Sequence, residues 1–341
     1  MYYTGIDLHK FTSYLTTIDS SGAIVKQSRQ GGMKNVAHNF VQYFNSIPGE
    51  HKATVESTMT WYWLNDLLTS INIPLVLAHA KYVKAIAYAK VKTDKVDSHT
   101  LAQLLRMNFI PVAHKISNDN RTLRDALRAR LKIVQRHTSV TNSMQLLLAK
   151  YNFDSPTQLS GIPEFQYEQL TKVEELLNEQ MLELEKQLYP SLIPNDDIQR
   201  LLWIPGIGKM NAFTILLEVD DINRFPDVKN FFSYSRLTPS ARNSGGKSKQ
   251  RSSKDGNKYL KSVFTDAAIH AVQYYPVIKK FHNSLLHKKN KFVARTIIAK
   301  EIARVVFYTL KYKTDFNNKF KGKELEHTKS LQWPRVVSPS A

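Results

Sequence analysis

Apolar and β-branched residues recur in short runs at the start of the chain, and each run ends at a turn signal. The runs are Tyr2–Leu8, Phe11–Ile18 and Ala23–Ser28, and the dipeptide Ser21–Gly22 separates the second from the third. Runs of this length, bounded by polar or glycine residues, are typical of β-strands. The pattern therefore predicts that the chain begins with three strands.

The period of the pattern then alternates between that of helices and that of strands. Apolar positions at helical spacing predict a helix from about Lys34 to Phe44. A strand, a helix, a strand and further helices to about Met107 follow, over Lys52–Glu56, Trp61–Ser70, Pro74–Ala78 and the residues after them. The order βββ-α-β-α-β-α predicts an α/β domain with a mixed sheet over residues 1–115.

A different pattern begins near Asn118, where apolar side chains recur every three or four residues to about Tyr151. A second seam follows a break at 154–163 that contains proline, glycine and serine. Two long helices in succession predict an antiparallel coiled-coil arm over residues 116–190 that projects or dimerises, and an ordinary two-helix layer is the alternative. The seams consist of Leu123, Leu127, Leu131, Val134, Thr138, Thr141 and Leu148, then Leu170, Val173, Leu177, Met181, Leu184 and Leu188.

The remaining chain is predicted to form a mostly α-helical domain over residues 191–315. Pro190 and Pro194 separate it from the arm, and a polar, basic tail over residues 316–341 is expected to be poorly ordered. The predicted helices are Asp196–Trp203, Lys209–Val219, Asp227–Ser233, Asn257–Tyr274, Pro276–His287 and Lys291–Tyr312.

The balance of charge indicates the class of partner. The 341 residues include 48 Lys and Arg but 29 Asp and Glu, which gives a formal net charge of +19. An excess of this size favours polyanions, because a neutralised phosphate backbone releases its counterions. Composition therefore predicts a nucleic-acid partner, although it does not separate an enzyme from a ribosome-like or chromatin-like binder.

Two absences narrow the chemistry and the location. The chain has no cysteine, which excludes disulfides, thiolate zinc sites and a cysteine nucleophile, so any metal must be held by oxygen or histidine. The chain has no apolar run of roughly 18 residues, and its N-terminus lacks the pattern of a secretory signal. We expect a cytoplasmic protein that spans no membrane.

Four carboxylates in the first domain are candidates for a metal site. Asp7 lies at the end of the first strand and Glu56 ends the fourth, whereas Asp94 and Asp97 share one face at the start of a helix. Strand ends at one edge of a sheet converge, and Mg²⁺ prefers such oxygen ligands. One or two Mg²⁺ ions held there would stabilise the attacking and leaving oxygens of phosphoryl transfer.

Each of these carboxylates also has an alternative interpretation. Asp94 follows Thr93 and would serve simply as a helix N-cap, while Glu56 would be solvent-exposed. Asp7 is harder to explain structurally, because an unpaired carboxylate in an apolar strand is costly. His9 and Lys10, next to it, are interpreted as an exposed turn.

The second domain contains a glycine turn between two helical segments, in the sequence LLWIPGIGKM. It resembles a helix-hairpin-helix, in which Gly206 and Gly208 would let backbone N–H groups approach a phosphate next to Lys209. A tight interhelical turn without ligand is the alternative.

A basic, serine-rich segment follows at Ser240–Lys254 and has no apolar periodicity, which excludes it from the core. It is either a flexible phosphate-binding loop or the site of a serine nucleophile, whose transition-state charge the neighbouring cations would neutralise. Ser244 precedes Gly245–Gly246 and has the backbone freedom to reach a phosphate, although the residues alone do not single it out. The segment holds Ser240, Ser244, Ser248, Ser252 and Ser253 among Arg242, Lys247, Lys249, Arg251 and Lys254, and Lys258 follows.

Together these motifs resemble the IS110 family of insertion-sequence transposases, which is related to the Piv/MooV DNA invertases, over nearly the whole chain. Asp7, Glu56, Asp94 and Asp97, with the D-K-x-D spacing of the last two, resemble the DEDD quartet of a RuvC-like, ribonuclease-H-like domain. The segments IPGIG, SRLTPSARNSGGK and KDGNKYLK resemble the family's C-terminal transposase domain, although Arg236 stands where the family usually has glycine.

The resemblance implies functions that composition does not. Mg²⁺ would bind at the DEDD quartet, and Ser244 would form a covalent phosphoserine link to DNA, acting with the carboxylates of another subunit. A noncoding bridge RNA would pair with donor and target DNA, the arm would dimerise, and a tetramer would form the synaptic complex in the bacterial cytoplasm, at the nucleoid.

Two other functions remain open at this point. A Mg²⁺-dependent structure-specific nuclease, such as a Holliday-junction resolvase, would use water as the nucleophile and leave the serines to touch phosphates. A non-catalytic RNA- or DNA-binding protein with a degenerate domain is the third, and the complete carboxylate quartet argues against it.

Overall fold

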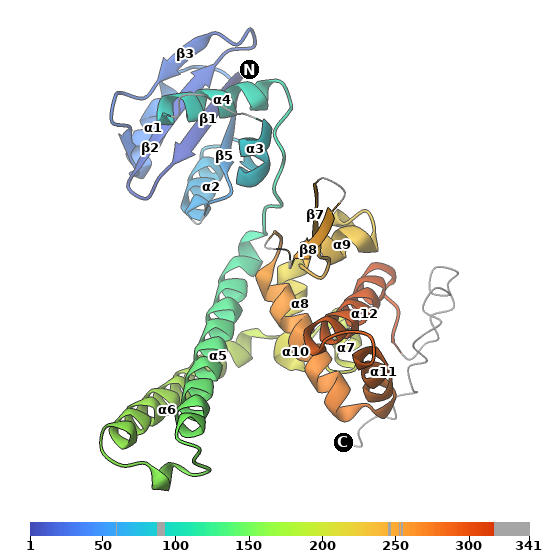
Figure 1. Cartoon of the computed structure of the whole chain (residues 1–341). Coiled ribbons are helices and arrows are strands. Elements are labelled where there is room, and N and C mark those ends of the chain that lie inside the picture. The colour runs from blue at the N-terminus through green and yellow to red at the C-terminus, as the bar shows by residue number, and fades with distance from the viewer. Residues whose placement is uncertain (59, 87–92, 245–246, 252, 254, 317–341) are drawn as a thin grey trace. The chain divides into compact units, whose positions relative to one another are not determined.

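The computed structural model describes residues 1–58, 60–86, 93–244, 247–251, 253 and 255–316 (Figure 1). The chain divides into two compact units, residues 1–115 and the residues from 116 onward. The first is a mixed α/β unit and the second is mostly helical, as the sequence predicts. Among the described residues, no helix is long and apolar enough to cross a membrane.

The first unit is built on one twisted sheet in the order β3-β2-β1-β5-β6, with β4 paired to β2. Strand β1 is antiparallel to β2 but parallel to β5, and β5 is parallel to β6, so the sheet is mixed. Because β1 and β5 run in the same direction, their carboxyl ends meet at one edge of the sheet. The strands are β1 (Tyr2–Leu8), β2 (Thr12–Ile18), β3 (Ile24–Gln27), β4 (Met33–Lys34), β5 (His51–Glu56) and β6 (Leu75–Ala78).

Helices cover the two faces of this sheet. Helices α1 (Ala37–Asn45) and α2 (Trp61–Ser70) pack on one face, where Ile6 and Leu8 of β1 contribute to a buried core. Alternation along β1 turns Gly5 to the opposite face, against α4 (Asp94–Arg106). A Cβ added at Gly5 would lie 2.0 Å from the carbonyl oxygen of Ser98, so α4 lies directly on β1. Helix α3 (Ala80–Ile86) follows β6.

Two long helices begin the second unit, α5 (Asn118–Lys150) and α6 (Ile162–Leu188), and they lie side by side (Figure 1). The short helix η1 (Pro156–Gln158) lies in the connection between them. Leu127, Leu177 and Leu188 of the predicted seams are buried, whereas Thr138 and Val173 are exposed. The predicted seam between the two helices is therefore confirmed in part. In a straight helix, positions that repeat every seven residues drift around the helix axis, so some of them turn away from the partner helix.

The remaining helices form a compact bundle that matches the predicted ranges closely. Phe231, Phe264 and Ile298 lie in its buried core, and Leu127 of α5 belongs to the same core. The bundle consists of η2 (Tyr189–Ser191), α7 (Asp196–Leu202), α8 (Lys209–Val219), η3 (Ile222–Arg224), α9 (Val228–Tyr234), α10 (Lys258–Tyr274), α11 (Pro276–Leu286) and α12 (Lys291–Tyr312).

The serine-rich segment is not wholly irregular, and this corrects the expectation of a flexible loop. Strands β7 (Ser240–Ser244) and β8 (Lys247–Arg251) form an antiparallel two-stranded ribbon, in which Ser240 pairs with Arg251 and Ser244 with Lys247. The backbone N–H and C=O groups of a ribbon pair with each other whatever the side chains are. A prediction that relied on apolar alternation therefore missed these strands.

Candidate active site

Two of the predicted carboxylates lie at the same edge of the first sheet. Asp7 is the second-last residue of β1, and Glu56 is the last residue of β5. The parallel register pairs Ile6 with Val55, so Asp7 and Glu56 occupy the next step along the two strands. Alternation places them on the same face as Gly5, which is the face that α4 covers.

Helix α4 brings the other two carboxylates to this edge. Asp94 is its first residue and Asp97 lies in the same first turn. The buried hydroxyl groups of Thr16 on β2 and Ser98 on α4 are 2.7 Å apart, and with the contact at Gly5 they fix the helix on the sheet. The start of α4 therefore stands over the carboxyl ends of β1 and β5.

The interpretation of Asp94 as the helix N-cap is wrong. Thr93 caps the helix, since its side-chain oxygen accepts a hydrogen bond from the backbone N–H of Val96 over 3.3 Å. Asp94 is the first residue inside the helix, where the backbone dipole favours a negative charge. Its carboxylate is not used for capping and faces Asp7 and His9.

His9 joins these carboxylates. Ligand atoms of Asp7, His9 and Asp94 all lie within 4.8 Å of one another. His9 Nε2 is 3.3 Å from Asp7 Oδ2 and 3.4 Å from Asp94 Oδ1. The side chains of Asp7, His9 and Asp94 are 22%, 50% and 59% exposed, so the cluster is open to solvent on one side.

Sequence reasoning missed His9 as a member of the site and placed it in an exposed turn. It is half exposed and it does follow the strand, but its ring turns back toward Asp7. The signal was present in the spacing, because residues two apart in an extended chain point to the same side. A histidine two positions after an aspartate at a strand end can therefore reach the same metal ion as that aspartate.

The donor set fits a divalent cation. Carboxylate oxygens of Asp7 and Asp94 and an imidazole nitrogen of His9 surround one small space, and divalent cations bind donors of these types. Glu56 and Asp97 come from the same strand edge and the same helix turn as the clustered residues, and each has further interactions of its own. Asp7, Glu56, Asp94 and Asp97 remain the predicted ligand set, of which the structure brings Asp7 and Asp94 together with His9.

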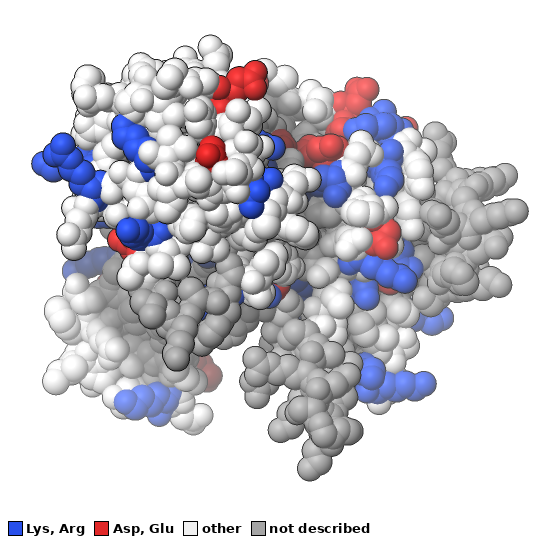
Figure 2. Space-filling model, turned by 90° about the horizontal axis from the view of Figure 1, so that it is seen from above, with Lys and Arg blue, Asp and Glu red and all other residues white. Residues whose placement is uncertain are grey.

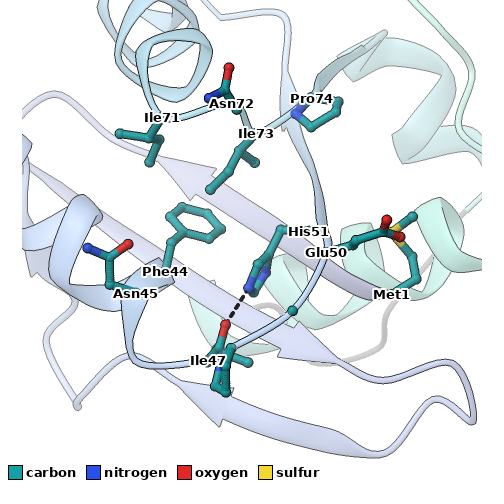
Figure 3. Close-up of a pocket in the computed structure, with 12 residues that line it drawn as sticks. Met1, Phe44, Asn45, Ile47, Glu50, His51, Ile71, Asn72, Ile73 and Pro74 are labelled. Carbon is teal, nitrogen blue, oxygen red and sulfur yellow. Dashed lines mark hydrogen bonds between the residues drawn. The ribbon is translucent and has the colours of Figure 1, made fainter.

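A separate hollow of about 670 Å³ lies at the opposite edge of this sheet, near the starts of β1, β5 and β6 (Figure 3). His51 Nε2 and the carbonyl oxygen of Ile47 are 2.7 Å apart across it. The described lining residues include Glu50 but no lysine or arginine. The hollow therefore lacks the cations that a nucleic-acid backbone requires.

In the second unit, the predicted helix-hairpin-helix turn joins α7 to α8. Gly206 has φ +83°, and a Cβ there would lie 2.0 Å from the carbonyl oxygen of Ala267, so packing on α10 requires glycine. Gly208 is different, because nothing lies within 4 Å of an added Cβ and its φ of −88° suits any residue. Packing explains Gly206 only, and the open backbone at Gly208 is where a phosphate can approach.

This turn forms one wall of a groove of about 1110 Å³ between α5, α8 and α10. Four predicted contact residues line it together, namely Gly206, Gly208, Lys209 and Lys258. Lys209 Nζ lies 4.6 Å from the centre of the Tyr189 ring, which also lines the groove. The groove therefore combines lysine side chains, an aromatic ring and unobstructed space at Gly208.

Ser244 is the last residue of β7. Its register partner is Lys247, and Arg242 pairs with Lys249. Arg251, the last residue of β8, lies at the base of the ribbon opposite Ser240. Lys254 lies outside the described residues, and the structure describes the backbone of the ribbon but not its side chains.

A buried carboxylate anchors the chain just after the ribbon. The Glu218 side chain is 1% exposed, and its oxygens accept hydrogen bonds from Arg124, Arg128 and Asn257. Burial alone would raise the pKa of Glu218, but the hydrogen bond from Arg128 and the charges of both arginines hold it below its ordinary value. Sequence reasoning missed this residue, although a single glutamate in the apolar run TILLEV was the signal.

Two family models match the chain. Residues 4–153 match a transposase model of the DEDD type, and residues 198–283 match the model of the transposase IS116/IS110/IS902 family. The mixed sheet with acidic residues at its edge and the helical second unit thus define a DNA transposase with a RuvC-like DEDD nuclease domain. The chain belongs to the IS116/IS110/IS902 family of insertion-sequence transposases.

Two insertion-sequence transposases are similar to the chain over three quarters or more of its length. The chain is 23% identical over 333 residues to the transposase for insertion sequence element IS1328 of Yersinia enterocolitica, covering 92% of this chain and 98% of that protein. It is 24% identical over 290 residues to the transposase for insertion sequence element IS1111A of Coxiella burnetii, covering 77% of this chain and 76% of that protein. The protein therefore acts on DNA, and its DEDD domain implies a divalent metal.

Proposed function

We propose that this transposase cuts and exchanges DNA strands through a covalent phosphoserine intermediate formed by Ser244, with Mg²⁺ at Asp7, Glu56, Asp94 and Asp97. The convergence of Asp7, His9 and Asp94 at the sheet edge carries the metal part of the proposal. The position of Ser244 at the end of the first strand of a ribbon rich in Lys and Arg supports the nucleophile. Across the ribbon, Ser244 is the register partner of Lys247.

The covalent step needs no further reactant. The Ser244 hydroxyl oxygen bonds to the scissile phosphorus, the bond from phosphorus to a deoxyribose oxygen breaks, and that oxygen takes the proton that serine lost. Attack by another deoxyribose hydroxyl on the phosphoserine restores the serine and joins the strands. Bound Mg²⁺ supplies charge neutralisation at the phosphate oxygens.

A noncoding bridge RNA is the proposed guide, and two observations support contacts with nucleic acid. Lys and Arg side chains are spread over the face seen in Figure 2, whereas Asp and Glu side chains gather at fewer places. The groove of the second unit adds Lys209 and Lys258 next to the glycine turn. A formal charge of +19 gives the affinity for RNA and DNA a common electrostatic origin.

The proposed assembly is a homodimer through the arm, with a tetramer in the synaptic complex. One face of α6 carries Ile162, Phe165, Val173 and Leu176, all exposed. An apolar stripe at helical spacing on a projecting helix is the surface that a second helix would bury. Such a dimer would let the serine of one subunit act with the carboxylates of another.

Trapping the covalent intermediate tests the nucleophile. A suicide DNA substrate, nicked next to the scissile phosphate, should trap a protein–DNA adduct with the wild-type protein and none with Ser244→Ala. Ser240→Ala and Ser248→Ala, which alter the same ribbon, are the matched controls and should keep the adduct. An undiminished adduct in Ser244→Ala would overturn the assignment.

A structure-specific nuclease remains the second candidate, because the carboxylate edge belongs to a unit of its own and would serve a water nucleophile equally well. It predicts free 5′-phosphate or 3′-hydroxyl ends and no adduct in any variant. The non-catalytic alternative is dropped, because the chain belongs to a transposase family.

A further inference from the structure

We infer that His9 is a direct ligand of the divalent ion and that it shifts the preference of the site from Mg²⁺ toward Mn²⁺. The inference rests on the proposed role of the carboxylates as the metal site. It adds a nitrogen donor to a set that would otherwise consist of oxygen alone.

The distances around His9 match those between ligands that share one cation. Metal–ligand bonds of about 2.1 Å place neighbouring ligand atoms about 3.0 Å apart in an octahedral shell and about 3.4 Å apart in a tetrahedral one. His9 Nε2 lies 3.3 Å from Asp7 Oδ2 and 3.4 Å from Asp94 Oδ1. Both distances from His9 thus already match ligands of one ion, and the ligand atoms of Asp7 and Asp94 lie within 4.8 Å of each other.

Hydrogen bonding between the side chains is a weaker explanation of the same geometry. One Nε2–H cannot point straight at two carboxylates, and both distances exceed the usual range of about 2.7–3.2 Å for N–H···O bonds. A cation in the shared space would instead be approached by the lone pairs of all three groups. The arrangement therefore fits a ligand triad better than a bridging ion pair.

The backbone of His9 is held in place. Its N–H donates to the carbonyl oxygen of Thr12 over 3.0 Å, and its carbonyl oxygen accepts from Asn35 Nδ2 over 2.9 Å. These bonds fix the turn between β1 and β2, which reduces the entropy lost when the ring binds an ion. A half-exposed histidine on such an anchored turn is positioned rather than freely moving.

The nature of the donor determines the preferred ion. Mg²⁺ prefers oxygen ligands and gives up its bound water reluctantly, whereas transition-metal ions bind imidazole nitrogen more strongly. A site of carboxylates with one imidazole should therefore bind Mn²⁺ more tightly than Mg²⁺, while Mg²⁺ still supports activity. Replacing His9 should remove this preference and leave an oxygen-only site.

Manganese spectroscopy of the full chain tests the inference. Mn²⁺ bound to metal-free wild-type protein should show ¹⁴N coupling in pulsed electron paramagnetic resonance, and His9→Gln should lose it. The Kd for Mn²⁺ should rise by about 10-fold or more in His9→Gln, whereas the Kd for Mg²⁺, measured by competition, should change less than about threefold. His99→Gln, on α4 and bonded to Gln103, is the matched control and should behave like wild type.

The outcomes separate the inference from the proposed function. Mn²⁺ that binds to wild type and is lost in Asp7→Asn, but shows no ¹⁴N coupling, overturns the role of His9 and leaves the metal centre in place. Coupling that persists in His9→Gln also overturns it. Equal, weak Mn²⁺ binding by wild type and Asp7→Asn overturns both, because the carboxylates would then hold no ion.

Discussion

The side-chain amide of Asn257 donates a hydrogen bond to Glu218 Oε2 over 2.7 Å. The same side chain caps α10, since its Oδ1 accepts from the backbone N–H groups of Tyr259 and Leu260. Glu218 is bound in turn by Arg124 and Arg128 of the long helix α5. One buried carboxylate thus connects α5 to the helix that follows the serine ribbon.

Replacing Glu218 by glutamine should destabilise the second unit by about 3 kcal/mol, because two partly buried arginines would lose their counter-charge. Urea unfolding of the full chain, followed by circular dichroism, measures this loss. Glu179→Gln, at an exposed position on α6, should leave the midpoint unchanged. Equal midpoints for Glu218→Gln and wild type would show that the network contributes nothing to stability.

The difference in stability between wild type and Glu218→Gln should depend on pH. The folded pKa of Glu218 is held below its ordinary value of 4.5, so its stabilising contribution is present above pH 4.5 and is lost as pH falls through the folded pKa. The difference in unfolding free energy between wild type and Glu218→Gln should therefore be constant near neutral pH and shrink below pH 4.5. A constant difference across that range would contradict the pKa assignment.

Gly5→Ala should weaken metal binding although it replaces no carboxylate. The added Cβ would meet backbone atoms of Ser98 and Ala102, so α4 must move away from β1 and carry Asp94 with it. We expect a stability loss of about 1–3 kcal/mol together with a weakened Kd for Mn²⁺. Gly208→Ala, where the added Cβ meets nothing, controls for the substitution itself. Wild-type metal binding in a folded Gly5→Ala protein would mean that α4 does not position the site.

Asp7→Asn should separate catalysis from nucleic-acid binding. Strand cleavage should fall by a factor of about 100 or more, because a group that neutralises transition-state charge is lost. Affinity for RNA, measured by filter binding at several salt concentrations, should stay within about threefold, since the basic surface supplies it. Collapse of RNA binding in a folded Asp7→Asn protein would indicate a structural role for the carboxylate.

The helix-hairpin-helix turn can be tested through its two glycines. Gly208→Ala should preserve the fold and weaken DNA binding about fivefold, equivalent to one lost hydrogen bond of about 1 kcal/mol. Gly206→Ala should instead destabilise the unit, because its Cβ would lie 2.0 Å from the backbone of Ala267. Unchanged DNA affinity in Gly208→Ala, measured by fluorescence anisotropy, would show that this segment is only a tight turn between α7 and α8 and does not bind phosphate.

Helix positions were the most predictable part of the fold. The ranges Lys209–Val219 and Lys291–Tyr312 follow from apolar periodicity and match α8 and α12 residue for residue. The ribbon at Ser240–Arg251 was not predictable in the same way, because its strands are held by backbone pairing and carry no apolar face. Apolar periodicity reveals a strand only when the strand has an apolar face, so it does not detect strands made almost entirely of polar residues.

The residues of the candidate site differ in the same way, since local sequence features pointed to some of them and not to others. Asp7, Glu56, Asp94 and Asp97 were identifiable because strand ends and a helix start are local features of the chain. His9 and Glu218 were not identified, since their importance depends on what lies across from them. A contact between residues far apart in the chain leaves no periodic signal in either segment.

The sequence by itself determined the α/β and helical halves of the protein, its affinity for polyanions, the absence of thiol chemistry and the four acidic candidates. These properties depend on residue type and on spacing within a few positions. Only the tertiary structure decided that Thr93 rather than Asp94 caps α4, that Gly5 lets this helix lie on β1, and that His9 faces two carboxylates. Each of these depends on distances between segments, which packing sets and local spacing does not record.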